Sequence, residues 1–242
     1  MTYCVGLLLQ QGIIFASDSR TNAGVDNFSQ FCKMTVFERR GERVIVLLSS
    51  GGLAGTQAII SVLKQRAEQS DGSPNIWTAR TMFDVAGLIS DATRDVERRD
   101  AAHSKTAALH FNASFIFGGQ IKGEAPRLFR SYAETNFIEA EPDSPFLQTG
   151  ETKYGKPILD RVITPTTSLA DATKCVLISF DSTMRSNLSV GLPIDLLSYE
   201  RDSLSASRRK RLDQGDPYFT ELSTAWSEGV RSAFKQLPEP RW

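Results

Sequence analysis

Short apolar runs that come in pairs constrain the fold of this chain more than any other sequence feature. Residues 3–9 and 13–17 are two such runs on either side of a Gln-Gln-Gly turn, and residues 34–39 and 43–49 flank an Arg-Gly-Glu turn. Two apolar runs joined by a short turn that contains glycine are typical of a β-hairpin. We therefore expect the chain to begin with two antiparallel hairpins whose strands are largely buried.

Helical periodicity follows each group of strands. Apolar residues recur at helical spacing over about 54–69 and 78–99. Further along, the pattern predicts strands at 111–121, 127–132, 144–150 and 189–199, and helices at about 152–162, 168–186 and 217–236. Strands in hairpins and helices in pairs favour antiparallel sheets covered by helices over a doubly wound parallel sheet. We predict an α+β sandwich and, because no linker or repeat is visible, a single domain over residues 1–242.

The composition excludes several classes of protein. The 242 residues are 40% hydrophobic and 23% charged with a formal net charge of +0, which gives no bulk attraction to nucleic acid or to an anionic membrane. No apolar stretch approaches the ~20 residues that span a bilayer, and the first residues lack the basic region of a signal peptide. The cysteines Cys4, Cys32 and Cys175 are odd in number and widely spaced, which fits a reducing cytoplasm. We expect a cytoplasmic protein with no metal, cofactor, nucleic-acid or membrane partner.

A basic run at Arg208–Arg211 lies within a polar segment from Ser203 to Gly215. No aromatic residue interleaves the four basic residues. A nucleic-acid site usually combines the two, so a solvated loop or a subunit contact is the expected role of this run.

Thr2 directly follows Met1, and a small residue at position 2 is what removal of the initiator methionine requires. Removal would leave a threonine that carries both a nucleophile, its hydroxyl, and a base, its free α-amine. The ordinary pKa of an α-amine is about 7.7–8.0, so a modest depression makes it a base at neutral pH. An arbitrary second residue is the alternative at this point.

An aspartate, Asp18, ends the second apolar run, and Lys33 stands at the start of the third. A carboxylate at the end of a buried strand is costly unless it is paired or hydrogen-bonded. Near a threonine amine, the lysine charge would lower the pKa of the nucleophile, and the aspartate would keep the lysine charged and in place. A plain ion pair at the end of a strand is the other interpretation.

The segment Ser50-Gly51-Gly52 ends one predicted strand and precedes a predicted helix. Backbone N–H groups at such a junction can stabilise an oxyanion. A tight turn that only needs glycine would give the same pattern.

Three segments together resemble a known family. They are Met-Thr-Tyr-Cys-Val at the start, Ser-Asp-Ser-Arg-Thr-Asn-Ala-Gly-Val-Asp at 17–26, and Ser-Asn-Leu-Ser-Val-Gly-Leu-Pro-Ile-Asp at 186–195. The chain resembles the proteasome β-subunit superfamily of N-terminal nucleophile hydrolases and, more narrowly, its bacterial Anbu family. The resemblance extends from residue 2 to at least residue 200.

The resemblance implies a four-layer αββα sandwich and a threonine-type endopeptidase that acts on a peptide or a small amide. It implies Thr2 as the nucleophile, Asp18 and Lys33 as its electrostatic partners, and the Gly51 N–H as an oxyanion donor. The loop after Asp18, which contains Ser19 and Thr21, would line the substrate cleft and pair with an extended peptide. The family also implies a homo-oligomer, an open ring or a helical assembly, to which residues of about 203–242 could contribute contacts. Whether an unfoldase acts with the assembly is left open by the sequence.

The chain departs from the proteasome pattern at accessory positions. Proteasome β-subunits usually carry a serine where this chain has Glu151 after Gly150, and an aspartate where it has Ser186; Ser189 keeps the usual serine. Either Glu151 replaces the lost carboxylate, or it simply begins a helix, where an acid is favourable. These changes leave two alternatives open: a non-catalytic assembly subunit with the same fold, or an amidase for a non-peptide amide.

Overall fold

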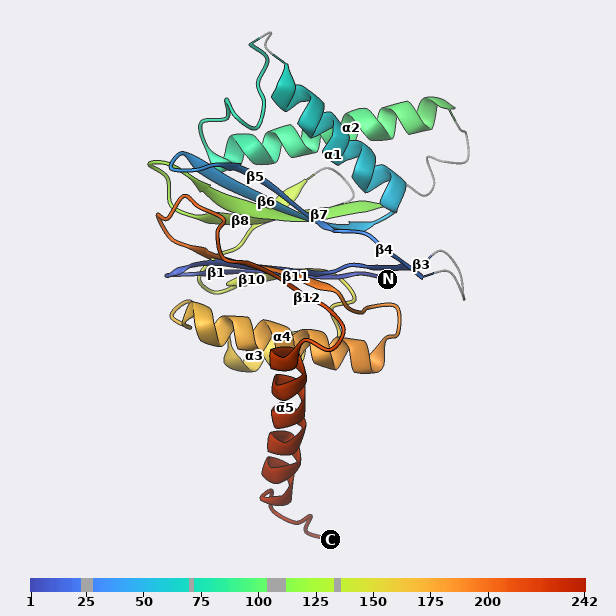
Figure 1. Cartoon of the computed structure of the whole chain (residues 1–242), viewed down its shortest axis with the longest axis vertical. Coiled ribbons are helices and arrows are strands. Elements are labelled where there is room, and N and C mark those ends of the chain that lie inside the picture. The colour runs from blue at the N-terminus through green and yellow to red at the C-terminus, as the bar shows by residue number, and fades with distance from the viewer. Residues whose placement is uncertain (23–27, 70–71, 104–111, 133–135) are drawn as a thin grey trace.

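The computed structural model describes residues 1–22, 28–69, 72–103, 112–132 and 136–242. Two antiparallel sheets lie face to face, with a pair of helices on the outer face of each (Figure 1). This arrangement confirms the predicted α+β fold and the four-layer αββα sandwich.

The first sheet has the order β10-β1-β2-β11-β12. Its strands are β1 (Tyr3–Leu9), β2 (Gly12–Asp18), β10 (Phe146–Gly150), β11 (Ile194–Glu200) and β12 (Arg209–Leu212). The second sheet has the order β5-β6-β7-β8-β9. Its strands are β5 (Met34–Arg39), β6 (Arg43–Gly51), β7 (Ala113–Ile121), β8 (Arg127–Ser131) and β9 (Phe137–Glu139). A separate two-stranded ribbon consists of β3 (Arg20–Asn22) and β4 (Phe28–Gln30).

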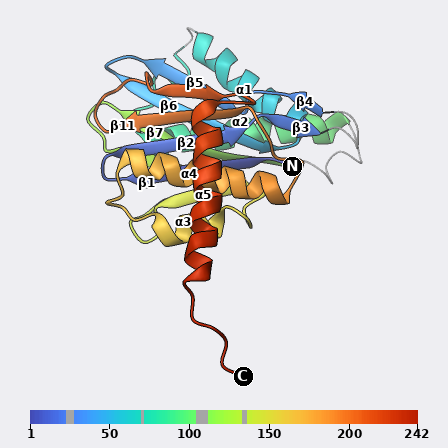
Figure 2. The same ribbon diagram turned by 60° about the horizontal axis from the view of Figure 1, so that its bottom comes forward.

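Helices cover the outer faces of both sheets (Figure 1). The second sheet is covered by α1 (Leu53–Glu68) and α2 (Met82–His103), and the first by α3 (Lys156–Val162) and α4 (Leu169–Ser186). The last helix, α5 (Pro217–Lys235), begins beside α4 and projects away from the four layers (Figures 1 and 2).

Burial on both faces of each sheet explains why the strands are continuous apolar runs in the sequence. In β1, Tyr3, Val5 and Leu7 belong to the core under α3 and α4, whereas Cys4 belongs to the core between the two sheets. Because side chains alternate along a strand, one run of β1 supplies both cores. A third core lies between the second sheet and the helices α1 and α2.

Three residues of the basic run, Arg209 to Arg211, lie in strand β12, so the expectation of a loop is wrong for them. β12 forms the edge of the first sheet and pairs with β11. Each basic side chain of the run has an acidic partner: Arg208 pairs with Glu200, Arg209 with Glu38, Lys210 with Asp216 and Arg211 with Asp195. Charged side chains are common on an edge strand, where they discourage pairing with other chains.

Several boundaries differ from the predicted ones. The helix expected from 152 begins only at Lys156, so Glu151 lies outside its first turn and the helix-start interpretation of Glu151 is wrong. The strand expected from 189 begins at Ile194, directly after Pro193, which has no N–H to donate to a ladder. The strands β3, β4 and β9 were not predicted, and position 111 of the predicted strand 111–121 lies outside the described residues.

Candidate active site

Thr2 directly precedes β1, and its backbone is held by the strand end opposite. Its carbonyl accepts a 2.7 Å hydrogen bond from the backbone N–H of Glu151. The approach requires glycine at position 150, where φ is +84° and a Cβ atom would lie 1.9 Å from the Thr2 oxygen. Thr2 stands two residues before Cys4, whose side chain faces the space between the sheets, and Thr2 lines a cavity there.

Lys33 and Asp18 form a buried ion pair next to Thr2. The Lys33 Nζ lies 2.8 Å from Asp18 Oδ1 and also donates to the Arg20 carbonyl at 2.7 Å. The same carboxylate oxygen accepts the backbone N–H of Tyr3 at 3.0 Å. One aspartate therefore fixes both the lysine and the backbone that follows Thr2.

Burial dominates the electrostatics of Asp18, whose side chain is fully inaccessible. Desolvation raises the pKa of its carboxyl above the ordinary value, against the opposing effect of Lys33 and of the hydrogen bonds it accepts. The pair therefore depends on both members remaining in place, because either charge alone would be buried without compensation.

Gly51 is the last residue of β6, and the register of that strand indicates the direction of its backbone N–H. Ser49 N–H donates to Lys33 O, and N–H groups two residues apart on a regular antiparallel strand point to the same side. Gly51 lies two residues after Ser49 on β6, so its N–H points to the same side of the strand, the side on which Lys33 lies. Glycine is required here because φ is +102° and a Cβ atom would lie 2.1 Å from Asn112 O.

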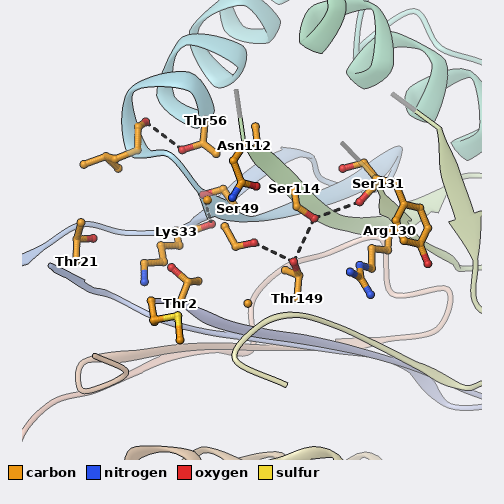
Figure 3. A pocket seen from close by; sticks show the side chains of 17 residues that line it. Thr2, Thr21, Lys33, Ser49, Thr56, Asn112, Ser114, Arg130, Ser131 and Thr149 are labelled. Carbon is orange, nitrogen blue, oxygen red and sulfur yellow. Dashed lines mark hydrogen bonds between the residues drawn. The ribbon is translucent and has the colours of Figure 1, made fainter. Parts of the chain in front are cut away.

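These groups share one cavity of about 600 Å³. Thr2, Thr21, Lys33 and Gly51 all line it, so the structure brings together the predicted nucleophile, its lysine and the glycine of the strand end. Figure 3 shows the Lys33 ammonium next to the Thr2 side chain. Ser19, by contrast, is fully buried, and its hydroxyl donates to the Pro193 carbonyl at 2.8 Å.

Two accessory residues, Glu151 and Ser189, belong to a second group that is joined to Thr2 through the Glu151 backbone. The buried Glu151 carboxylate accepts a 2.9 Å hydrogen bond from the Asn187 amide, whose oxygen accepts the Ser189 N–H at 2.9 Å. Ser186 ends α4 and is exposed. Sequence reasoning missed Asn187, although an amide immediately after the end of a predicted helix is a common helix-terminating residue.

In the described chain Met1 precedes Thr2, so the Thr2 nitrogen belongs to a peptide bond. Met1 also lines the cavity and is 61% exposed, which leaves it accessible to an aminopeptidase. Within the described ranges, no cluster of His, Cys, Asp or Glu side chains is arranged to hold a metal ion. Nor does any helix in those ranges have the length and apolar character needed to cross a membrane.

No family model and no curated protein matches the chain. Solved structures, by contrast, match it over its full length. An Anbu (Gly-1) mutant from Hyphomicrobium sp. strain MC1 is 49% identical with a TM-score of 0.94, and the match covers 100% of both chains. Anbu, described as an ancestral β-subunit, from Yersinia bercovieri is 46% identical with a TM-score of 0.94, covering 99% of this chain and 100% of that one.

The chain belongs to the Anbu family. A third Anbu structure, a helical assembly of the Anbu complex from Pseudomonas aeruginosa, is 45% identical with a TM-score of 0.92, covering 99% of this chain and 98% of that one. The match spans the C-terminal helix as well as the sandwich, so Anbu similarity extends beyond the residue 200 to which the sequence motifs reach.

Proposed function

We propose that this protein is a threonine-type N-terminal nucleophile hydrolase that cleaves a peptide or amide bond after Met1 has been removed. The observation that carries the proposal is the buried Lys33–Asp18 pair in contact with the cavity that Thr2 lines. A buried charge pair at the edge of a cavity is a common feature of catalytic sites.

In the proposed reaction the Thr2 Oγ attacks the amide carbonyl and its proton passes to the freed α-amine. An ammonium has three N–H donors, and the bonds of Lys33 to Asp18 and Arg20 leave one for the Thr2 oxygen. The positive charge stabilises the oxygen as it loses its proton. Asp18 holds the lysine in that position.

The carbonyl oxygen becomes an oxyanion, and the Gly51 N–H is the proposed donor to it. Collapse of the tetrahedral intermediate breaks the C–N bond, and the Thr2 ammonium returns its proton to the departing amine. Water then attacks the acyl ester, with the α-amine again accepting the proton, and releases the carboxylic acid and free Thr2.

Glu151 is the proposed replacement for the carboxylate that the proteasome pattern has at the position of Ser186. Its carboxylate is held by Asn187, next to the backbone that fixes Thr2. In this arrangement Glu151 and Asn187, with Ser189 behind them, orient the start of β1. Thr21 is the proposed contact for an extended substrate because it lines the same cavity and lies on the short strand β3.

Self-assembly is the second part of the proposed function. It is supported by the helical assembly of the Pseudomonas aeruginosa relative and by α5, on which Trp226, Val230 and Phe234 are exposed. Exposed apolar residues along one helix indicate an interface with another chain. A purely scaffolding subunit would use the same surface, so catalysis must be tested separately.

The test combines an intact-mass measurement with a β-lactone or epoxyketone probe, which reacts with a free N-terminal threonine. We expect loss of the mass of methionine and one adduct at Thr2, with no adduct on the Thr2→Ala variant. A fully processed chain that takes no adduct would contradict the hydrolase and favour the scaffold. Parallel turnover of peptides and of small non-peptide amides would separate a peptidase from an amidase.

A further inference from the structure

A second cation lines the cavity that contains Thr2. Figure 3 shows Thr2 and Lys33 toward one end of the cavity and Arg130, on β8, toward the other. The two cations differ in one respect: Lys33 is neutralised by Asp18, whereas the described residues provide no acidic partner within ion-pair distance of Arg130.

The register of the second sheet directs Arg130 inward. Arg130 lies directly opposite Ile116 of β7, and Leu128 lies two residues earlier on the same face of β8. Both apolar residues are fully buried in the core between the sheets. Residues that share a face of a sheet point in the same direction, so the Arg130 side chain starts toward the space between the sheets, where it is partly buried.

The guanidinium is incompletely satisfied there. Its Nε atom is buried and has no hydrogen-bond partner among the described residues. The described contact is with the ring of Tyr132, whose centroid lies 4.9 Å from the Arg130 Cζ. A buried donor of a charged group without a partner is unfavourable, because neither water nor protein replaces its lost hydrogen bonds.

The walls between the two ends of the cavity are polar but uncharged. The Ser50 and Thr149 hydroxyls lie 2.9 Å apart, Thr149 donates to Ser114 at 3.1 Å, and Ser114 donates to the Ser131 carbonyl at 3.1 Å. No aspartate or glutamate is among the described residues that line this cavity. Of the charged side chains that line it within the described ranges, Lys33 is paired with Asp18, and Arg130 has no acidic partner within ion-pair distance.

Arg130 also borders a second cavity, but the charges there are different. That cavity, of about 610 Å³, is lined by the acidic side chains of Glu139, Glu141, Asp143 and Asp160, and by Lys156, which pairs with Asp160. An anion would be repelled by these carboxylates. Of the two cavities, the one that contains Thr2 is therefore the one in which Arg130 can accept a negatively charged ligand.

We propose that Arg130 binds a carboxylate of the substrate, so that the site selects a peptide that places an Asp or Glu side chain, or a C-terminal carboxylate, in the cavity beside the bond that Thr2 attacks. A guanidinium matches a carboxylate with two parallel N–H donors, and the Nε–H is one of the donors used in such pairs. The inference rests on the proposed hydrolase function, since it assigns the specificity of the same site.

The experiment measures binding and labelling separately. In a processed Thr2→Ala background, fluorescence anisotropy compares peptides that differ only as Glu and Gln, each with a C-terminal carboxylate or amide. We expect about tenfold tighter binding of one carboxylate peptide than of its neutral match. Adding Arg130→Gln removes this difference, Arg130→Lys restores part of it, and Arg208→Gln, directly before the edge strand β12, leaves it unchanged.

If the Glu-to-Gln change in the peptide abolishes the tighter binding, Arg130 recognises a side chain. If amidation of the C-terminus abolishes it, Arg130 recognises the C-terminal carboxylate. Equal affinities in the Thr2→Ala protein, or a preference that survives Arg130→Gln, would overturn the assignment to Arg130. A wrong hydrolase proposal would give a different result, namely the absence of a Thr2 adduct in the processed wild-type chain. The binding measurement does not require turnover, so the two failures are distinguishable.

Discussion

Lys33 Nζ lies 2.8 Å from Asp18 Oδ1, with the two side chains only 6% and 0% exposed. The charges compensate one another where both side chains are almost completely shielded from solvent. Removing one member leaves the other buried and alone, which is costlier than removing both.

Lys33→Met is therefore expected to lower the free energy of unfolding by about 3 kcal/mol. The double variant Lys33→Met with Asp18→Asn should be more stable than Lys33→Met alone, because no carboxylate remains unpaired. Neither should form the Thr2 adduct. Urea unfolding and mass spectrometry measure the two effects, and a double variant less stable than the single one would contradict the pairing argument.

Gly51 must be glycine for two reasons, its positive φ and the proximity of Asn112 O. Gly51→Ala should cost about 3 kcal/mol of unfolding free energy and slow labelling of Thr2, because the strand end shifts. Gly41 is a matched control: its φ is +78°, but no other atom lies within 4 Å of the point that an alanine Cβ would occupy. Gly41→Ala should cost only about 1 kcal/mol and leave labelling unchanged. Equal losses for the two variants would show that the Asn112 contact is unimportant.

Glu151 keeps its shape but loses its charge in the variant Glu151→Gln. The amide oxygen still accepts from Asn187, so the unfolding free energy should change by less than about 1 kcal/mol. If the carboxylate assists Thr2, the rate of β-lactone labelling should fall by about tenfold. Ser186→Ala, at an exposed position, is the control and should label at the wild-type rate. Unchanged labelling of Glu151→Gln would leave the residue a purely structural role.

The buried thiols predict how stability changes at high pH. Burial raises the pKa of Cys175 to about 11, whereas an unfolded thiol ionises near pH ~8.5. Between these values the unfolded chain binds fewer protons, so the free energy of unfolding should fall as the pH rises. Urea titrations at pH 8 and pH 10 should show a smaller fall for Cys175→Ala than for the wild type.

The three cysteines should differ in how fast they react with an alkylating reagent. Cys32 is exposed, whereas Cys4 and Cys175 are buried. Iodoacetamide should therefore modify Cys32 first in the folded protein at pH 8, as peptide mapping would reveal. Faster modification of Cys175 than of Cys32 would contradict the packing of α4.

Assembly should depend on the part of α5 that leaves the sandwich. Phe219 is buried, and Ser223 donates to Asp181 of α4, so the first turns are anchored. Replacing the exposed Trp226 and Phe234 by serine should leave the circular dichroism unchanged but reduce the mass measured by light scattering. Glu228→Gln on the same helix is the control. An oligomer of unaltered mass in the double serine variant would exclude this surface as the interface.

Local sequence determined the alternation of hairpins and helix pairs, because each apolar run and each turn leaves its own pattern over a few residues. It also placed Asp18 at a strand end and Gly51 at the strand-to-helix junction, where the structure has them. The roles of Thr2, Asp18 and Lys33 were one of two interpretations of their residue types until the family resemblance favoured them, and catalysis by them remains a prediction.

Only the tertiary structure decided which distant residues meet. The basic run became a paired edge strand because Glu38, Asp195, Glu200 and Asp216 surround it, and the pairing with Glu38 in particular joins segments far apart in the sequence. Arg130 looks like an ordinary surface residue in its own segment. Its position becomes important because the register of β8 with β7 directs it toward the cavity that Thr2 also lines. Thr2 and Arg130 are far apart in the sequence, and no local pattern encodes the register that brings them to one cavity.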